Sequence, residues 1–124
     1  MTFRFNSKID DQFLYSLYED DLVYVEEIFN TTKNQLKSDI ARVSDAYLEK
    51  NLTDLKRAIH KIKPSFGFVG LLQAEEICKN FEEQCASAGS VAELEPSYHK
   101  LIHAINESQR IIDEECLRLK EHNN

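Results

Sequence analysis

Apolar residues recur every three or four positions between residues 22 and 47. On a helix, which turns about 100° per residue, such positions share one face. One four-residue step passes over Asp39, which a strict heptad would place on this face. The pattern predicts one long amphipathic helix of about 28 residues ending near residues 49–50. Its buried face comprises Leu22, Val25, Phe29, Thr32, Leu36, Ile40, Val43 and Tyr47.

Shorter amphipathic segments lie on either side of this helix. One is expected at about residues 9–18, with Ser7 as its N-cap and a buried face of Phe13, Leu14 and Leu17. Another is expected to begin after an Asn51 cap, supported by Asp54, and to end between residues 66 and 70. Its buried stripe comprises Leu52, Leu55, Ile59, Ile62 and Phe66.

Two further helices are predicted in the C-terminal half. One spans about residues 72–88, stops at Gly89 and has the stripe Leu71, Ala74, Cys78, Phe81, Cys85 and Ala88. The other begins after Ser90, in two steps because of Pro96, and continues to about Lys120. Residues 121–124 are expected to fray. The stripe of this last helix comprises Leu94, Tyr98, Leu101, Ile105, Ile112 and Leu119.

Short connections between the four longer helices require neighbours to run antiparallel. The sequence thus predicts an all-α fold, an antiparallel up-down-up-down four-helix bundle with a short extra N-terminal helix over one end. A chain of 124 residues suits one core, so we expect a single domain over residues 1–124 with its bundle core at about residues 20–120. A monomer is expected, and Met1 with the polar tail favours a free-standing chain.

Composition narrows the class of partner. The net charge of −7 argues against a general nucleic-acid binder and against binding to an anionic membrane surface. No stretch approaches the roughly 20 apolar residues of a membrane span, and the N-terminus lacks a signal-peptide core. We therefore expect a cytoplasmic protein. Cys78, Cys85 and Cys116 lie on or near apolar stripes and are expected to be buried.

His60 lies outside the apolar stripe of its helix. With His60 at zero on the helical circle, Lys56 lies at about −40°, Lys63 at about −60°, Pro64 at about +40° and Gly67 at about −20°. The imidazole therefore faces solvent beside two lysines. An exposed imidazole is mostly neutral at pH 7, and nearby lysine charges disfavour its protonation. A ring nitrogen should thus be available as a nucleophile.

The residues around His60 resemble the histidine-containing phosphotransfer (HPt) domain, the His-to-Asp relay module of two-component signalling. The family pattern has a histidine, a lysine three residues later, a small residue, a serine or threonine, and a glycine ten residues after the histidine. The matching positions here are His60, Lys63, Pro64, Ser65 and Gly70. Pro64 stands where the family usually has glycine, and it predicts a kink just past the histidine.

The resemblance implies a role for each of these residues. His60 would be the phosphoacceptor, taking a phosphoryl group from one receiver-domain aspartate and passing it to another. Lys63 would stabilise the phosphoryl oxygens, and Lys56 would add a longer-range attraction. The supporting residues would be Pro64, Ser65, Gly67 and Gly70. Both glycines are expected to supply positive φ angles at the helix end, and Gly67 has the alternative role of keeping the surface over His60 open.

The resemblance also implies the partners. These would be response-regulator receiver domains or a hybrid sensor histidine kinase, and the receiver would bring the Mg²⁺. This chain would bind no cofactor or metal and would not phosphorylate itself from ATP. Lys61 directly follows the histidine, where kinase dimerisation domains usually have an acidic residue, which favours the relay module. The apolar docking surface would include Ile59, Phe68 and Val69, unless these residues belong to the core.

Two other interpretations remain open. In the first, the bundle is a non-catalytic interaction module and His60 is incidental. In the second, His99 and His103, four residues apart on the last predicted helix, share one face and bind a metal. No Glu-x-x-His motif accompanies that pair. An ordinary solvated helix face is the simpler explanation for those histidines.

Overall fold

Every described element of the chain is helical. The computed structural model describes residues 3–124, which form α1 (Asp11–Tyr18), α2 (Leu22–Leu48), α3 (Leu52–Phe68), α4 (Leu72–Ser87), the short 3₁₀ helix η1 (Val91–Leu94) and α5 (Glu95–Asn123). This range contains no strand. The all-α class predicted from the sequence is confirmed, as is the two-step start of the last helix near Pro96.

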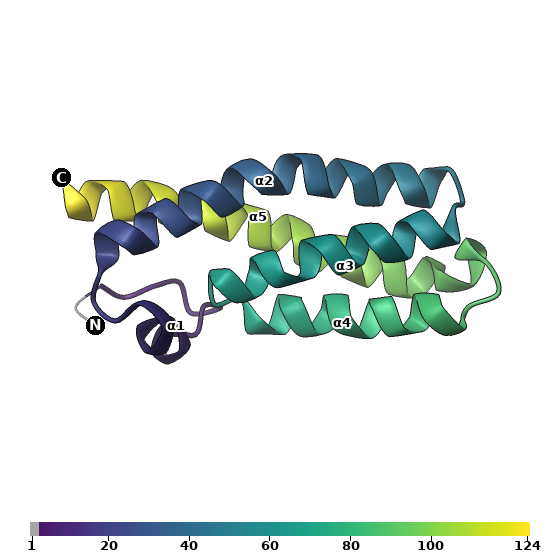
Figure 1. The fold of residues 1–124 in the computed structure, drawn as a ribbon, viewed down its shortest axis with the longest axis horizontal. Coiled ribbons are helices and arrows are strands. Elements are labelled where there is room, and N and C mark those ends of the chain that lie inside the picture. The colour runs from purple at the N-terminus through teal and green to yellow at the C-terminus, as the bar shows by residue number, and fades with distance from the viewer. Residues whose placement is uncertain (1–2) are drawn as a thin grey trace.

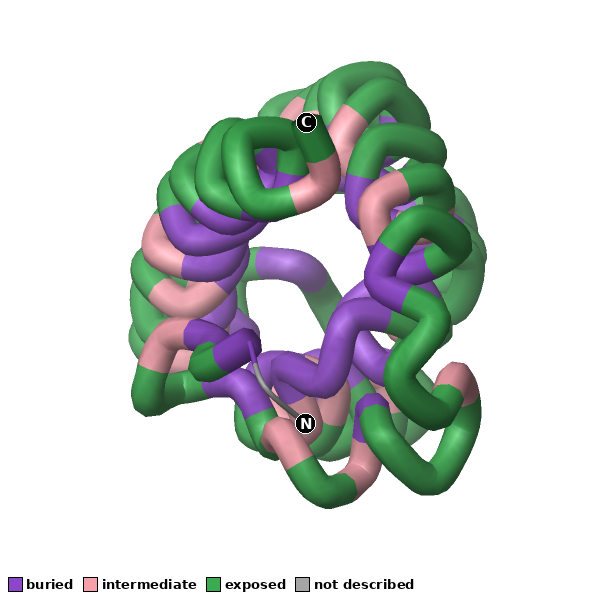
Figure 2. Tube along the Cα trace, turned by 90° about the vertical axis from the view of Figure 1, so that its left-hand side faces the viewer, coloured by how far each residue is buried: buried purple, intermediate pink, exposed green. Residues whose placement is uncertain are grey.

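The four long helices lie side by side, and α1 lies across one end of them (Figure 1). The chain reverses direction at each short connection between α2, α3, α4 and α5 (Figure 1). Seen from the end that α1 covers, buried residues line the inside of the ring of helices and exposed residues the outside (Figure 2). Within residues 3–124, no helix is long and apolar enough to cross a membrane.

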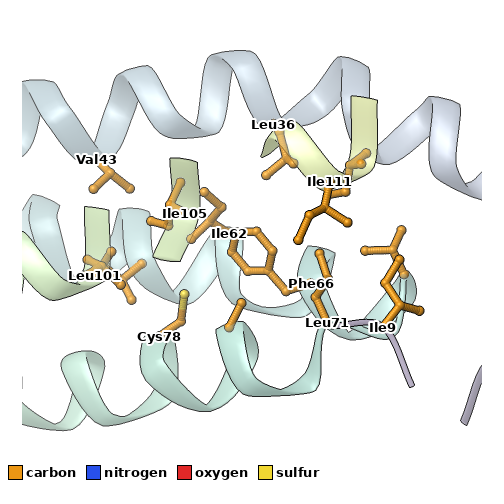
Figure 3. Packing of buried hydrophobic residues seen from close by; sticks show 14 of the residues in the cluster. Ile9, Leu36, Val43, Ile62, Phe66, Leu71, Cys78, Leu101, Ile105 and Ile111 are labelled. Carbon is orange, nitrogen blue, oxygen red and sulfur yellow. The ribbon is translucent and has the colours of Figure 1, made fainter. Parts of the chain in front are cut away.

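The core is made of the apolar stripes that the sequence pattern predicts. Side chains from α2, α3, α4 and α5 meet between the helices (Figure 3). Each buried aliphatic or aromatic side chain stabilises the fold by about 1.5 to 3 kcal/mol. The largest fully buried side chains include Phe29, Leu36, Leu55, Ile59, Ile62, Phe66, Leu101, Ile105, Ile112 and Leu119.

The three cysteines belong to this core, as predicted. All of them are free and buried. Burial raises the pKa of Cys78 to about 12 and those of Cys85 and Cys116 to about 11. Because the thiolate is the reactive form, these thiols are unreactive near neutral pH.

The connection between α3 and α4 is a Schellman turn. Gly70 has a φ of 74°, its N–H donates to Gly67 O at 3.1 Å, and the Leu71 N–H donates to Phe66 O at 2.9 Å. These are the two hydrogen bonds of that motif, with glycine in the left-handed position. The prediction of a positive φ is thus confirmed for Gly70 and wrong for Gly67, which lies inside α3.

Residues 3–18, which we call the N-terminal cap, cover the end of the bundle that contains Gly70. The apolar side chains of Phe3, Phe5, Ile9 and Leu14 are buried there. The Asp10 N–H donates to Gly70 O at 3.0 Å, while the Asp10 side chain accepts from the Phe13 N–H at 2.9 Å. This tertiary hydrogen bond fixes Asp10 at the start of α1.

Two predictions for this first helix are consequently wrong. Its N-cap is Asp10 rather than Ser7, and Leu17 is 49% exposed rather than buried. The predicted fraying of the C-terminal tail is also wrong, because α5 extends to Asn123. The Asn123 amide donates to Leu22 O and to Glu26 Oε1, both at 2.9 Å, and so holds the last turn against the start of α2.

Candidate functional site

Helix α3 places His60 on the outside of the bundle. The helix is capped by Asn51, whose side chain accepts from the Asp54 N–H at 3.0 Å and donates to Asp54 Oδ2 at 2.9 Å. Its stripe of Leu55, Ile59, Ile62 and Phe66 is fully buried. Burial of that stripe fixes the rotation of α3 about its axis. The His60 side chain is therefore 69% exposed.

A carboxylate from the neighbouring helix joins His60 to Lys63. Glu82 of α4 lies with Oε2 2.7 Å from His60 Nδ1 and with Oε1 2.8 Å from Lys63 Nζ. Each oxygen of the carboxylate thus has its own partner on α3. We call His60, Lys63 and Glu82 the His60 site. Its members come from two helices, so it exists only once α3 and α4 have packed.

The carboxylate is well placed to hold a charge. Only 17% of the Glu82 side chain and 26% of the Lys63 side chain are exposed. Burial alone would raise the pKa of Glu82, but the hydrogen bonds from Lys63 and His60 outweigh it and lower the pKa below its usual value. The same hydrogen bond to Glu82 raises the pKa of Lys63. The ion pair therefore persists over a wide range of pH.

This geometry selects one form of the imidazole. An ionised carboxylate can only accept hydrogen bonds, so His60 Nδ1 must carry a proton to bond Glu82. In a neutral ring the other nitrogen, Nε2, then holds the lone pair. The site consequently presents an outward-facing Nε2 as a nucleophile or base, with Nδ1–H anchored from behind.

Glu82 is the residue that sequence reasoning missed. The sequence shows positive charges near His60, and the structure adds a carboxylate in direct contact. One signal was available, because His60 and Glu82 are each eleven residues from Leu71 at the α3–α4 turn. In an antiparallel helix pair, residues equidistant from the turn lie at the same level. Gly67 and Glu75 obey the same count and are in contact.

A second carboxylate, buried between helices, holds Lys61 away from the imidazole. Asp39 of α2 is 2% exposed, and its Oδ1 lies 3.3 Å from Lys61 Nζ and 3.4 Å from Arg42 Nη1. Asp39 occupies the position that a strict heptad would bury, whereas Ile40, predicted for that face, is only partly buried. The sequence prediction for this turn is therefore corrected by one residue.

Comparison with known proteins identifies the fold family. The family model described as the Hpt domain matches residues 27–117. The chain belongs to the Hpt domain family. Hpt domains are phosphocarriers rather than kinases, and they work with receiver domains and histidine kinases in two-component signalling. The resemblance stated from the sequence is confirmed.

A solved Hpt domain supports the fold independently. The crystal structure of the HPT domain from a Shewanella sensor hybrid histidine kinase superposes with a TM-score of 0.77 at 13% sequence identity. The match covers 90% of this chain and 95% of that one. At this identity the likeness shows the fold alone. No curated protein matches the sequence.

The remaining residues of the Hpt pattern have distinct surroundings. Pro64 is exposed on the same face of α3 as His60, and α3 remains helical through Pro64 to Phe68. Ser65 is buried on the other side of α3. A Cβ on Gly67 would collide with the Glu75 carboxylate of α4. Gly67 thus makes room for the Glu75 side chain of the neighbouring helix.

The apolar docking candidates divide between core and surface. Ile59 and Val69 are fully buried and belong to the core. Phe68 is 53% exposed, and its carbonyl accepts from the Tyr18 hydroxyl at 2.9 Å. Tyr18 in turn contacts Tyr24, with ring centroids 5.7 Å apart. Together with Pro64, these aromatic residues form an apolar surface of this Hpt domain on the C-terminal side of His60, in which Tyr18 is half-buried and the other three are exposed.

The other histidines lack a comparable setting. His99 and His103 are exposed on α5, each facing a glutamate of its own helix at 3.8 and 3.9 Å. Among residues 3–124, no group of three or more candidate ligands is arranged for a metal ion. The pair therefore has no third ligand in the described part of the chain. His60 is distinguished from both by its carboxylate partner from another helix.

Proposed function

We propose that this Hpt domain is a phosphorelay intermediate that accepts a phosphoryl group on His60 from one receiver aspartate and passes it to another. The observation that carries the proposal is the hydrogen bond between His60 Nδ1 and Glu82, on a histidine that is otherwise exposed. The bond directs the Nε2 lone pair outward, where a receiver can reach it. The proposed scaffold is the up-down-up-down four-helix bundle expected from the sequence.

The transfer follows from the state of the ring. The Nε2 lone pair attacks phosphorus, an N–P bond forms, and the P–O bond to the receiver aspartate breaks with its electron pair returning to the aspartate carboxylate. Nδ1 keeps its proton, so the ring becomes positively charged as the bond forms. Glu82 stabilises that charge through a charge-assisted hydrogen bond. Transfer to the next aspartate reverses these steps.

Lys63 and the receiver complete the proposed site. Lys63 holds Glu82 in place and brings a positive charge to within one turn of His60. The receiver supplies the acidic pocket and its Mg²⁺, and the apolar surface of Pro64, Phe68, Tyr18 and Tyr24 gives it a docking face beside the histidine. The chain works as a phosphocarrier and needs no nucleotide site of its own.

Transfer from a phosphorylated receiver domain tests the proposal. We expect an acid-labile, base-stable label on the wild type and none on His60→Gln. The matched control is His103→Gln, which removes an 83% exposed histidine from α5 and should leave labelling unchanged. Labelling of His60→Gln would contradict the assignment. A folded wild type that takes no label from several receivers would instead favour the interaction module.

A further inference from the structure

Four basic side chains surround His60 on α3, and they fall into two pairs. Lys61 is bound to Asp39 of α2, and Lys63 is bound to Glu82 of α4. The side chains of Lys56 and Arg57 form no ion pair or hydrogen bond within residues 3–124, and both residues are exposed. The two cations without an ion pair therefore lie on the N-terminal side of the histidine.

Lys56 and Arg57 share a shallow pocket with the imidazole. The pocket has a volume of about 360 Å³ and is lined by Thr53, Lys56, Arg57, His60 and Glu82. On the helical circle the three other α3 residues lie within about 60° of His60, so all four project from one face. Lys63 does not line this pocket. Its ammonium lies on the other side of the Glu82 carboxylate, toward the C-terminus of α3.

Lys56 belongs to α3 and Glu82 to α4, and both line this pocket. The charge of Lys56 also opposes the rise that burial causes in the pKa of Cys85, three residues beyond Glu82 along α4. Arg57 lies on the other side, since it also lines a hollow between α2 and α3.

Lys63 is poorly suited to leave Glu82 for a phosphoryl group. Its pKa is raised first by the hydrogen bond to Glu82 and further by the charges of Glu82 and Glu75, against an opposing effect of burial. Releasing Lys63 would leave a largely buried carboxylate with His60 as its sole partner, and an uncompensated buried charge is costly. The ion pair should therefore persist during transfer.

We propose that Lys56 and Arg57 bind the phosphoryl oxygens on His60 Nε2, while Lys63 is a positioning residue that acts through Glu82. This inference rests on the proposed function. It gives the direct contact with the phosphoryl oxygens, which the sequence pattern assigns to Lys63, to Lys56 and Arg57 instead. The pocket would receive the dianionic phosphoryl group between two cations. Glu82 can line it because the ion pair with Lys63 compensates its charge.

Phosphorylation of the full chain with phosphoramidate, without any receiver, tests this assignment. The 31P resonance of phosphorylated His60, identified by its absence in His60→Gln, is titrated to give the pKa of the phosphoryl group. Nearby positive charge favours the dianion, so Lys56→Gln should raise that pKa by about 0.5 to 1 pH unit, and Arg57→Gln by a comparable amount. The control Lys100→Gln, on α5, should leave it unchanged.

The matched single-charge variant is Lys63→Gln. We expect it to raise the phosphoryl pKa less than Lys56→Gln does, and to change the ring 15N shifts of unphosphorylated His60, which Lys56→Gln should leave alone. A larger pKa shift in Lys63→Gln, with Lys56→Gln indistinguishable from Lys100→Gln, would overturn the inference and leave the proposed function standing. Folded wild type that yields no phosphohistidine at position 60 would overturn both.

Discussion

The carboxylates of Glu115 and Glu82 each bridge two donors, yet they have different roles. Glu115 of α5 is 2% exposed and accepts two hydrogen bonds of 2.7 Å from Arg118 and one of 3.2 Å from the Asn6 N–H. Glu82 accepts from Lys63 and contacts His60, whose side chain is 69% exposed. Glu115 has only permanently charged or backbone partners, whereas one partner of Glu82 faces solvent and can react.

The comparison shows what distinguishes a structural ion pair from a functional site. Arg118 also donates to Arg4 O at 2.8 Å and lies over the Phe3 ring at 4.7 Å, so the Glu115 pair fastens the N-terminal cap to α5. The Arg118 guanidinium makes three hydrogen bonds inside the protein, two to Glu115 and one to Arg4 O. At Glu82 the carboxylate uses one nitrogen of His60 and leaves the other for a partner. The Glu115 pair therefore mainly stabilises the fold, whereas Glu82 positions a histidine that can react.

The largest effect on stability is expected from breaking the ion pair between Glu115 and Arg118. Arg118→Met leaves Glu115 buried without its cation, and we expect the free energy of unfolding to fall by about 3 to 5 kcal/mol, measured by urea denaturation. The control Arg110→Met removes an exposed pair with Glu114 and should cost less than about 1 kcal/mol. Equal effects of the two variants would refute the structural role of Glu115. Phosphotransfer by folded Arg118→Met should match the wild type.

Removing the Glu82 carboxylate should slow phosphoryl transfer rather than lower the stability of the fold. Glu82→Ala removes a charge-assisted hydrogen bond of about 1.5 to 3 kcal/mol, which corresponds to a roughly 10- to 100-fold slower transfer if it is expressed in the transition state. Glu82→Gln should recover part of the rate, because its amide oxygen still accepts from Nδ1–H. The exposed neighbour Glu83 provides the control variant Glu83→Gln. Unchanged single-turnover transfer rates in Glu82→Ala would rule out this role.

Gly67 and Gly70, near the C-terminal end of α3, should also differ in how much an alanine substitution destabilises the fold. Gly70→Ala places a side chain at a φ of 74° and within 3.0 to 3.1 Å of Leu14 and Ile9 of the N-terminal cap. We expect a loss of about 1 to 2 kcal/mol in unfolding free energy. Gly67→Ala, beside α4, need only displace the flexible Glu75 carboxylate and gains helix propensity, so its net effect should stay within about 1 kcal/mol. Thermal or urea unfolding that ranks the two in reverse would contradict this assignment.

The smallest expected effect is the pH dependence that the Glu82–Lys63 pair adds to stability. The pKa of Glu82 is lowered, so its contribution is present above the unfolded value near 4.5 and is lost as pH falls through the folded value. The pKa of Lys63 is raised, so its contribution is present below the unfolded value near 10.5 and is lost as pH rises through the folded value. Wild type should therefore exceed Glu82→Gln in unfolding free energy, by less than about 1 kcal/mol, only between roughly pH 4 and 11. A constant difference from pH 3 to pH 7 would argue against the pair.

Helical periodicity and capping residues were sufficient to predict most of the fold. The bounds of α2, α3 and α4 differ from the predicted ones by one or two residues, because their apolar stripes and caps are local signals. The errors occur where a distant residue decides the outcome. Asp10 is the N-cap of α1 because it bonds Gly70, and Asn123 stays helical because it bonds Leu22 and Glu26.

The part of the candidate site that lies on α3 was predictable from the sequence, whereas its contact with α4 was not predicted. The spacing of His60 and Lys63 on α3 is visible in the sequence, as is the exposure that follows from the apolar stripe. Their contact with Glu82 depends on how α3 and α4 pack, and the sequence signals it only through the equal distances of His60 and Glu82 from Leu71 at the turn. The functions of Lys61 and Gly67 were likewise set by partners on other helices, Asp39 and Glu75.

The most direct test is NMR of the His60 ring in 15N-labelled protein before and after phosphorylation by a receiver. We predict that Nδ1 carries the proton in the free protein, that Nε2 is unprotonated, and that phosphorus couples to Nε2 after transfer. In Glu82→Ala the two neutral tautomers should both be populated. Phosphorus bonded to Nδ1, or phosphorylation of another residue while His60 stays unmodified, would contradict the central claim that Glu82 prepares His60 as the phosphoacceptor.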